Sequence, residues 1–143
     1  MFNPSRDQAR QFLFDAWKKF REQAPLTDLE RLVVGHIGEH PEYHAILEAP
    51  ERYQEREWRP ELGETNPFLH LSMHLAISEQ LSIDQPAGVK GLYERLRAAL
   101  GDEHEAQHQV MDCLAEMIWT AQRHRQPPDG AAYLACLEKK CAA

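Results

Sequence analysis

Seven of the eight histidines of this 143-residue chain fall into three groups with four-residue spacing. The groups are His36, His40 and His44; His70 and His74; and His104 and His108. On an α-helix, positions i and i+4 project from the same face, so each group can direct two imidazoles at one point. Because neutral imidazole is the commonest metal ligand in proteins, this spacing predicts a mononuclear or dinuclear metal site.

The second and third groups share a further pattern. In each, apolar residues follow the first histidine at i+7 and i+11: Ile77 and Leu81, then Met111 and Ala115. Ile118 continues the second stripe. We therefore predict that both histidine pairs lie in the protein interior, each near one end of its helix. Burying uncompensated imidazole pairs costs on the order of a few kcal/mol per site, which is large against a domain stability of roughly 5–15 kcal/mol. A shared metal offsets this cost; hydrogen bonds to carboxylates or main-chain carbonyls are the alternative.

The candidate ligands can be ordered by how clearly the pattern places them. The first set is His70, His74, His104 and His108, and the second is His40 and His44. His36 ranks lower, because it and both following histidines cannot easily reach one ion. The carboxylate candidates, as ligands or as partners that fix an imidazole tautomer, are Glu48, Glu79, Asp112 and Glu116.

Iron or zinc is the expected cofactor. The HxxxE spacing of His44 and Glu48 and the HxxxH pairs resemble hemerythrin, and a lone histidine plus one HxxxH pair resembles the DinB-like bundle. Iron would imply O2 or NO binding, or a redox or sensing role; zinc with an open position would activate water. The alternative is a non-enzymatic protein-interaction module with buried structural histidines.

The elements that must position these residues are helical almost throughout. Apolar residues recur at helical spacing, and no stretch alternates like a strand. The sequence predicts an all-α protein, a compact bundle of five to six helices forming one domain over residues 1–143. Residues 50–65 are expected to be an irregular surface loop anchored by Trp58. Pro41 interrupts the second helix, which either kinks there or ends near Glu39.

Several short signals mark where helices begin and end. Thr27 to Glu30 is predicted to form a capping box, and Asn66-Pro67 restarts a helix. Asp102 to Glu105 is expected to form a second capping box that opens the long helix running to about Arg125. Gly101 is expected to end the preceding helix in the left-handed conformation.

Composition limits the partners and the compartment. The net charge of −7 disfavours nucleic acid, and no apolar run approaches membrane-spanning length. The sequence leaves room for a protein partner or a homo-oligomer but does not point to either. The cysteines, Cys113, Cys136 and Cys141, are odd in number, which argues against a disulfide framework and favours a reducing cytoplasm.

Three segments carry a family resemblance: HPEYH (40–44), NPFLHLSMHLAISEQ (66–80) and HEAQHQVMDCLAEMIWTAQR (104–123). They resemble a bacterial, mainly proteobacterial, family described as domain of unknown function 1841. The resemblance covers nearly the whole chain and includes most of the histidines. It implies a bacterial cytoplasmic protein and supplies no reaction.

Overall fold

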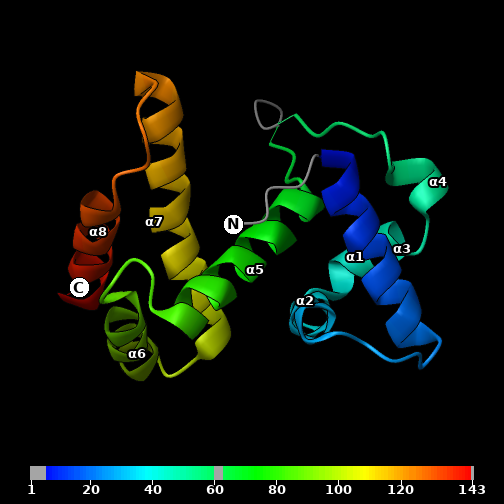
Figure 1. Ribbon diagram of the computed structural model, residues 1–143, viewed down its shortest axis with the longest axis horizontal. Coiled ribbons are helices and arrows are strands. Elements are labelled where there is room, and N and C mark those ends of the chain that lie inside the picture. Colours follow the sequence, from blue (N-terminus) through cyan, green and yellow to red (C-terminus); the bar gives the residue numbers. More distant parts are fainter. Residues whose placement is uncertain (1–5, 60–62, 143) are drawn as a thin grey trace. The chain divides into compact units, whose positions relative to one another are not determined.

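The computed structural model describes residues 6–59 and 63–142, and most of these residues lie in helices (Figure 1). They contain eight α-helices and one 3-10 helix and no strand, which confirms the all-α class. The expected five to six helices were too few, because the segment after Pro41 folds into several short helices. The elements are α1 (Arg6–Arg21), α2 (Asp28–Gly38), η1 (Pro41–Tyr43), α3 (His44–Leu47), α4 (Pro50–Tyr53), α5 (Pro67–Ile83), α6 (Val89–Leu100), α7 (Glu103–His124) and α8 (Gly130–Ala142).

The chain divides into two compact units. The N-terminal unit is Met1–Leu75 and the C-terminal unit is Ala76–Ala143, so the division falls inside α5. Each unit is described below by itself. The expectation of one domain stays a prediction.

In the N-terminal unit, α1 packs against α2 and α3. The capping box predicted at the start of α2 is present: the Glu30 amide donates to Thr27 Oγ1, and the Thr27 amide donates to the Glu30 carboxylate. The core of this unit is formed by buried apolar side chains that include Leu13, Phe14, Trp17, Val33, Ile37, Leu47, Phe68 and Leu71.

The helix interruption predicted at Pro41 is a true break. Helix α2 ends at Gly38, and Pro41 occupies the first position of η1. His40 lies between them with φ −128° and ψ 69°, outside the helical region, as expected for a residue that precedes proline. Because of this break, the direction of the His40 side chain is not set by the geometry of α2.

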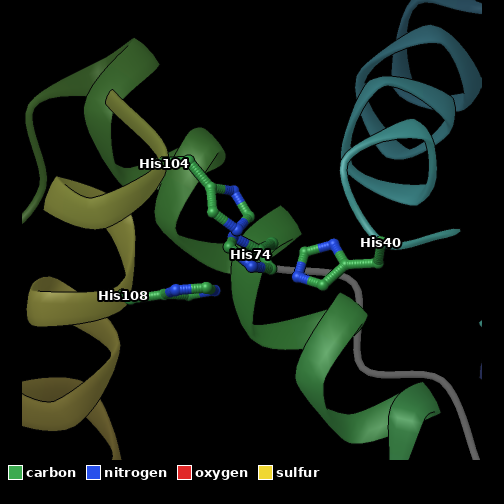
Figure 2. Close-up of side chains that lie close together, drawn as sticks. All are labelled: His40, His74, His104 and His108. Carbon is green, nitrogen blue, oxygen red and sulfur yellow. The ribbon is translucent and has the colours of Figure 1, made fainter. Parts of the chain in front are cut away.

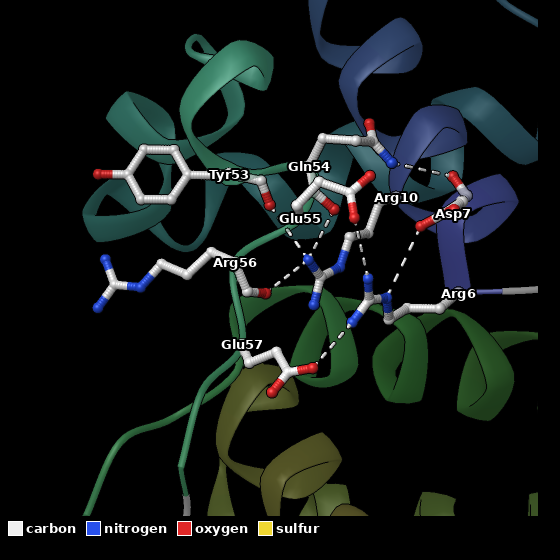
Figure 3. A network of polar contacts seen from close by, with 8 residues as sticks. All are labelled: Arg6, Asp7, Arg10, Tyr53, Gln54, Glu55, Arg56 and Glu57. Atoms are coloured by element: carbon white, nitrogen blue, oxygen red, sulfur yellow. Dashed lines mark hydrogen bonds and ion pairs between the residues drawn. The ribbon is translucent and has the colours of Figure 1, made fainter.

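Arg10 fixes the chain that follows α4 (Figure 3). Its side chain is buried, and its Nη1 donates to the carbonyl oxygens of Tyr53, Gln54 and Arg56 at 3.1, 2.9 and 2.7 Å. The guanidinium also lies over the rings of Trp58 and Phe68, 5.2 and 4.7 Å from their centroids. Burial lowers the pKa of Arg10, and the nearby Arg6 lowers it further.

The segment predicted as an irregular loop, 50–65, begins with the one-turn helix α4; its residues 60–62 lie outside the described residues. Trp58 is partly buried against the core, as expected of an anchor. Asn66 caps α5 as predicted, accepting from the amides of Phe68 and Leu69. Helix α5 also has exposed apolar residues, Leu69 and Ile83.

In the C-terminal unit, α6, α7 and α8 all pack against one another. Gly101 ends α6 with φ 71°, in the left-handed conformation that glycine adopts without strain. Asp102 then opens α7 by accepting from the His104 amide. The Tyr133 hydroxyl donates to Gln80 at 2.7 Å and ties α8 to the end of α5.

A disulfide joins α7 to α8, which the odd number of cysteines did not predict. Cys113 and Cys136 are bonded across 23 residues, and Cys141 is free. The expectation that cysteines would stay unpaired was wrong, because a long separation in sequence does not reveal that two helices lie side by side. The inference from cysteine number to a reducing compartment loses its basis.

Among the described helices, none combines the length and the apolar character needed to cross a membrane.

Candidate metal centre

Three histidines of the N-terminal unit bring their ring nitrogens together. His70 Nε2 lies 3.1 Å from His40 Nε2 and 3.2 Å from His74 Nε2. His70 and His74 lie on successive turns of α5, while His40 comes from the break between α2 and η1. Two elements thus supply three imidazole nitrogens to one small region.

The orientation of His40 is set by its other ring nitrogen. His40 Nδ1 lies 2.7 Å from the main-chain carbonyl oxygen of His36, to which only a protonated nitrogen can donate. In the neutral ring the proton is therefore on Nδ1, and the Nε2 lone pair faces His70. Metal-binding histidines commonly have this arrangement, in which a backbone acceptor fixes the tautomer.

The spacing of the three nitrogens suits one coordination sphere. Two nitrogens bound to zinc at 2.0–2.1 Å with tetrahedral angles lie about 3.3 Å apart. The two separations from His70 Nε2, 3.1 and 3.2 Å, are close to that edge length. The His40, His70 and His74 side chains could therefore hold a metal ion with little rearrangement.

The surroundings of these rings restrict access to water. His74 is fully buried and His40 nearly so, whereas His70 is half-buried. The buried His36 ring stacks on His74 with centroids 4.7 Å apart, so His36 supports two of the three rings. His36 thus supports the site through its main-chain carbonyl, which accepts from His40, and through its ring, which packs on His74. This agrees with the prediction that His36 ranks below the other histidines as a direct ligand.

Tyr43 is a neighbour of the site that the sequence pattern did not single out. Its ring lies parallel to that of His40, with centroids 5.2 Å apart and an interplanar angle of 3°, and edge-on to His70 at 5.9 Å. Burial raises the pKa of the Tyr43 phenol. The sequence did contain a signal for this contact: Pro41 begins the short helix η1, and this helix places Tyr43 beside His40.

His44 and the carboxylate candidate Glu48 have partners outside the three-histidine cluster. His44 Nε2 lies 2.9 Å from the Ile37 carbonyl, and its ring packs on Trp17 at 4.5 Å. The Glu48 carboxylate accepts from Trp17 Nε1 at 3.2 Å and lies near Arg21. Both residues serve the packing of α1 against α3.

The C-terminal unit carries its own imidazole pair on the first turns of α7. The rings of His104 and His108 are 4.2 Å apart at an angle of 67°. Figure 2 shows these two side chains on α7, and also His40 and His74 of the N-terminal unit. His104 and His108 are each partly exposed, and a nitrogen of one lies within 4.8 Å of a nitrogen of the other.

The apolar stripe predicted to continue inward from this pair is shorter than expected. Met111 is buried, but Ala115 and Ile118 are exposed. Helix α7 packs against α6 and α8, and its buried residues include Val110 and Leu114.

The other carboxylate candidates lie on the surface of the C-terminal unit. Glu79 and Asp112 are exposed, and Asp112 forms an ion pair with Lys140 at 3.6 Å. Glu116, also exposed, lies beside the disulfide, with Oε2 3.9 Å from Cys136 Sγ. Asp112 and Glu116 therefore have neighbours other than histidine.

The family of the chain is decided by a match to a family model over residues 5–139, described as Domain of unknown function (DUF1841). The chain belongs to the DUF1841 family. The resemblance seen in the histidine-bearing segments is thus confirmed, and this DUF1841 chain carries both histidine sets inside the matched region. Neither the curated proteins nor the solved structures give a match.

Proposed function

We propose that this DUF1841 chain is a transition-metal-binding protein whose ion is held by His40, His70 and His74. The single observation that supports this is the spacing of the three Nε2 atoms, 3.1 and 3.2 Å about His70, with His40 oriented by a main-chain carbonyl. This spacing is close to the edge of a tetrahedral coordination sphere, and hydrogen bonds between the imidazoles are the alternative that the metal measurement tests.

The donor set favours zinc over iron. Three neutral nitrogens suit zinc and its neighbours in the transition series, whereas iron sites in helical proteins usually add carboxylates. Glu48, the carboxylate candidate of the N-terminal unit, is engaged by Trp17. An iron centre with an O2, redox or sensing role would need Glu48 to leave that partner.

We extend the proposal to His104 and His108 as nitrogen ligands in the C-terminal unit. Their i, i+4 spacing and close rings support this assignment. The number of protein ligands per ion distinguishes a catalytic site from a structural or sensing site. An ion held by three nitrogens keeps an open position, which zinc uses to activate water, whereas four protein ligands are typical of structural or sensing sites.

The test is metal binding by the full chain, produced without a histidine tag. Its metal content is measured by mass spectrometry, and Zn²⁺ and Co²⁺ titrations give stoichiometry and affinity. His70→Ala removes the nitrogen common to both short contacts and is expected to weaken binding at least tenfold. His124→Ala, at an exposed position of α7, is the matched control and should bind like the wild type.

The outcomes are distinct. Wild-type protein that binds less than roughly a tenth of an equivalent would overturn the metal proposal, because tight sites retain their ion. The histidines would then be structural. Unchanged binding by His70→Ala would exclude the N-terminal set. The double variant His104→Ala, His108→Ala shows from the stoichiometry whether the second pair binds metal.

A further inference from the structure

The C-terminal unit has a pocket of about 150 Å³ beside the disulfide. Cys113 and Cys136 both line it, with α7 on one side and the start of α8 on the other. The two sulfur-bearing residues are unequal: Cys113 is 1% exposed, whereas Cys136 is partly exposed. A molecule in the pocket can therefore approach the disulfide at Cys136.

The polar part of the pocket wall is acidic. Glu116 and Asp129 line it, and no lysine or arginine is found among the described residues around it. Glu116 Oε2 lies 3.9 Å from Cys136 Sγ, and Asp129 accepts from the amides of Ala131 and Ala132 at the start of α8. A carboxylate this close to the sulfur attracts a cationic group and repels an anionic one.

We propose that Cys136 is a thiol–disulfide exchange site for small cationic aminothiols. The thiolate of the aminothiol attacks Cys136 Sγ, a new S–S bond forms there, and the Cys113–Cys136 bond breaks. Its electron pair goes to Cys113 Sγ, which takes up the proton that the aminothiol lost. The ammonium group of the aminothiol pairs with Glu116. No further oxidant or reductant is required.

Exchange does not need the unit to unfold. Besides the disulfide, α8 is held by the Tyr133 hydroxyl on Gln80 and by Lys140 Nζ on Gln109 Oε1 at 2.8 Å. The buried side chains of Tyr133 and Leu137 add apolar contacts. A mixed disulfide at Cys136 can therefore form while α8 stays docked.

The first test measures opening of the disulfide in the full chain carrying Cys141→Ser. Three thiols are compared: cysteamine (cationic), 2-mercaptoethanol (neutral) and 2-mercaptoethanesulfonate (anionic), each rate being divided by its rate with a small reference disulfide. We expect the normalised rate for the cation to exceed that for the anion about tenfold. Glu116→Gln should reduce this ratio, and Glu138→Gln, an exposed charge on α8, should not.

The second test locates the adduct by mass spectrometry. After reaction with cystamine, the disulfide of cysteamine, Cys113→Ala should carry the adduct on Cys136, and Cys136→Ala should leave Cys113 unmodified. Circular dichroism checks that both variants are helical; if either is not, the rates of the Cys141→Ser protein in the first test decide the matter. Equal normalised rates for the three thiols, or an adduct at Cys113, would overturn the proposal.

Discussion

His40 Nε2 and His70 Nε2 lie 3.1 Å apart although 30 residues separate them in the chain. The contact depends on the break after α2, because Pro41 holds His40 outside helical geometry and lets its ring turn toward α5. The proposed ligand set therefore has two parts. Helical spacing aligns His70 with His74, and the break between α2 and η1 places His40 beside them.

Zinc is expected to raise the thermal stability of the protein. An ion that binds only the folded chain stabilises it by about 2.7 kcal/mol at a concentration one hundred times Kd. The gain should fall as pH drops from 8 to 5, because imidazole must lose its proton to bind. Thermal unfolding with and without Zn²⁺ at each pH measures this. His70→Ala should show little gain, and a full gain in that variant would contradict the assignment.

Arg10→Met is expected to destabilise the protein by about 3 kcal/mol. The change leaves three main-chain carbonyls without their donor and removes the cation from the faces of Trp58 and Phe68. Urea unfolding measures the loss. Arg6→Ala is the control: its ion pairs, at 3.6–3.8 Å to Asp7, Glu55 and Glu57, are exposed and should contribute at most about 1 kcal/mol. Equal losses of stability for the two variants would contradict the conclusion that the buried Arg10 side chain stabilises this segment.

Glu30 is expected to make stability depend on acid pH. The hydrogen bond from Lys19, at 2.9 Å, and the Thr27 amide lower the pKa of this carboxyl below its ordinary 4.5. The folded pKa is depressed, so the contribution is fully present above pH 4.5 and is lost as pH falls through the folded value.

Glu30→Gln keeps the cap but loses the charge. The wild type should exceed it in free energy of unfolding at pH 7 by roughly 0.5–1 kcal/mol, and the difference should be smaller at pH 3. Denaturant midpoints at both pH values measure it, with the exposed Glu22→Gln as the control. A difference that persists unchanged at pH 3 would show that charge is not its source.

Reduction of the disulfide is expected to cost about 3 kcal/mol of unfolding free energy. The bond closes a loop across 23 residues, and the lost restriction of the unfolded chain sets this magnitude. Unfolding of the oxidised protein is compared with that of Cys113→Ala, Cys136→Ala. The transition of the N-terminal unit's tryptophans Trp17 and Trp58 serves as an internal comparison. If the double substitution leaves the free energy of unfolding unchanged, the packing of α8 is sufficient to stabilise the C-terminal unit without the disulfide.

Local signals in the sequence were reliable where a few adjacent residues decide the geometry. The capping box at Thr27, the cap at Asn66 and the left-handed Gly101 are all present, because each needs only its own neighbours. The apolar period alone did not show which face of α7 would be covered. It assigned Ile118 to the interior, and the residue is exposed.

By itself, the sequence determined the all-α class, the helix ends at Thr27, Asn66 and Gly101, and the four-residue spacing that aligns His70 with His74. These follow from hydrogen bonds and side-chain directions within one helix. Only the tertiary structure decided that His40 joins that pair, that His44 turns to a carbonyl, and that Cys113 meets Cys136. Such contacts depend on how separate helices pack, which no spacing along the chain records.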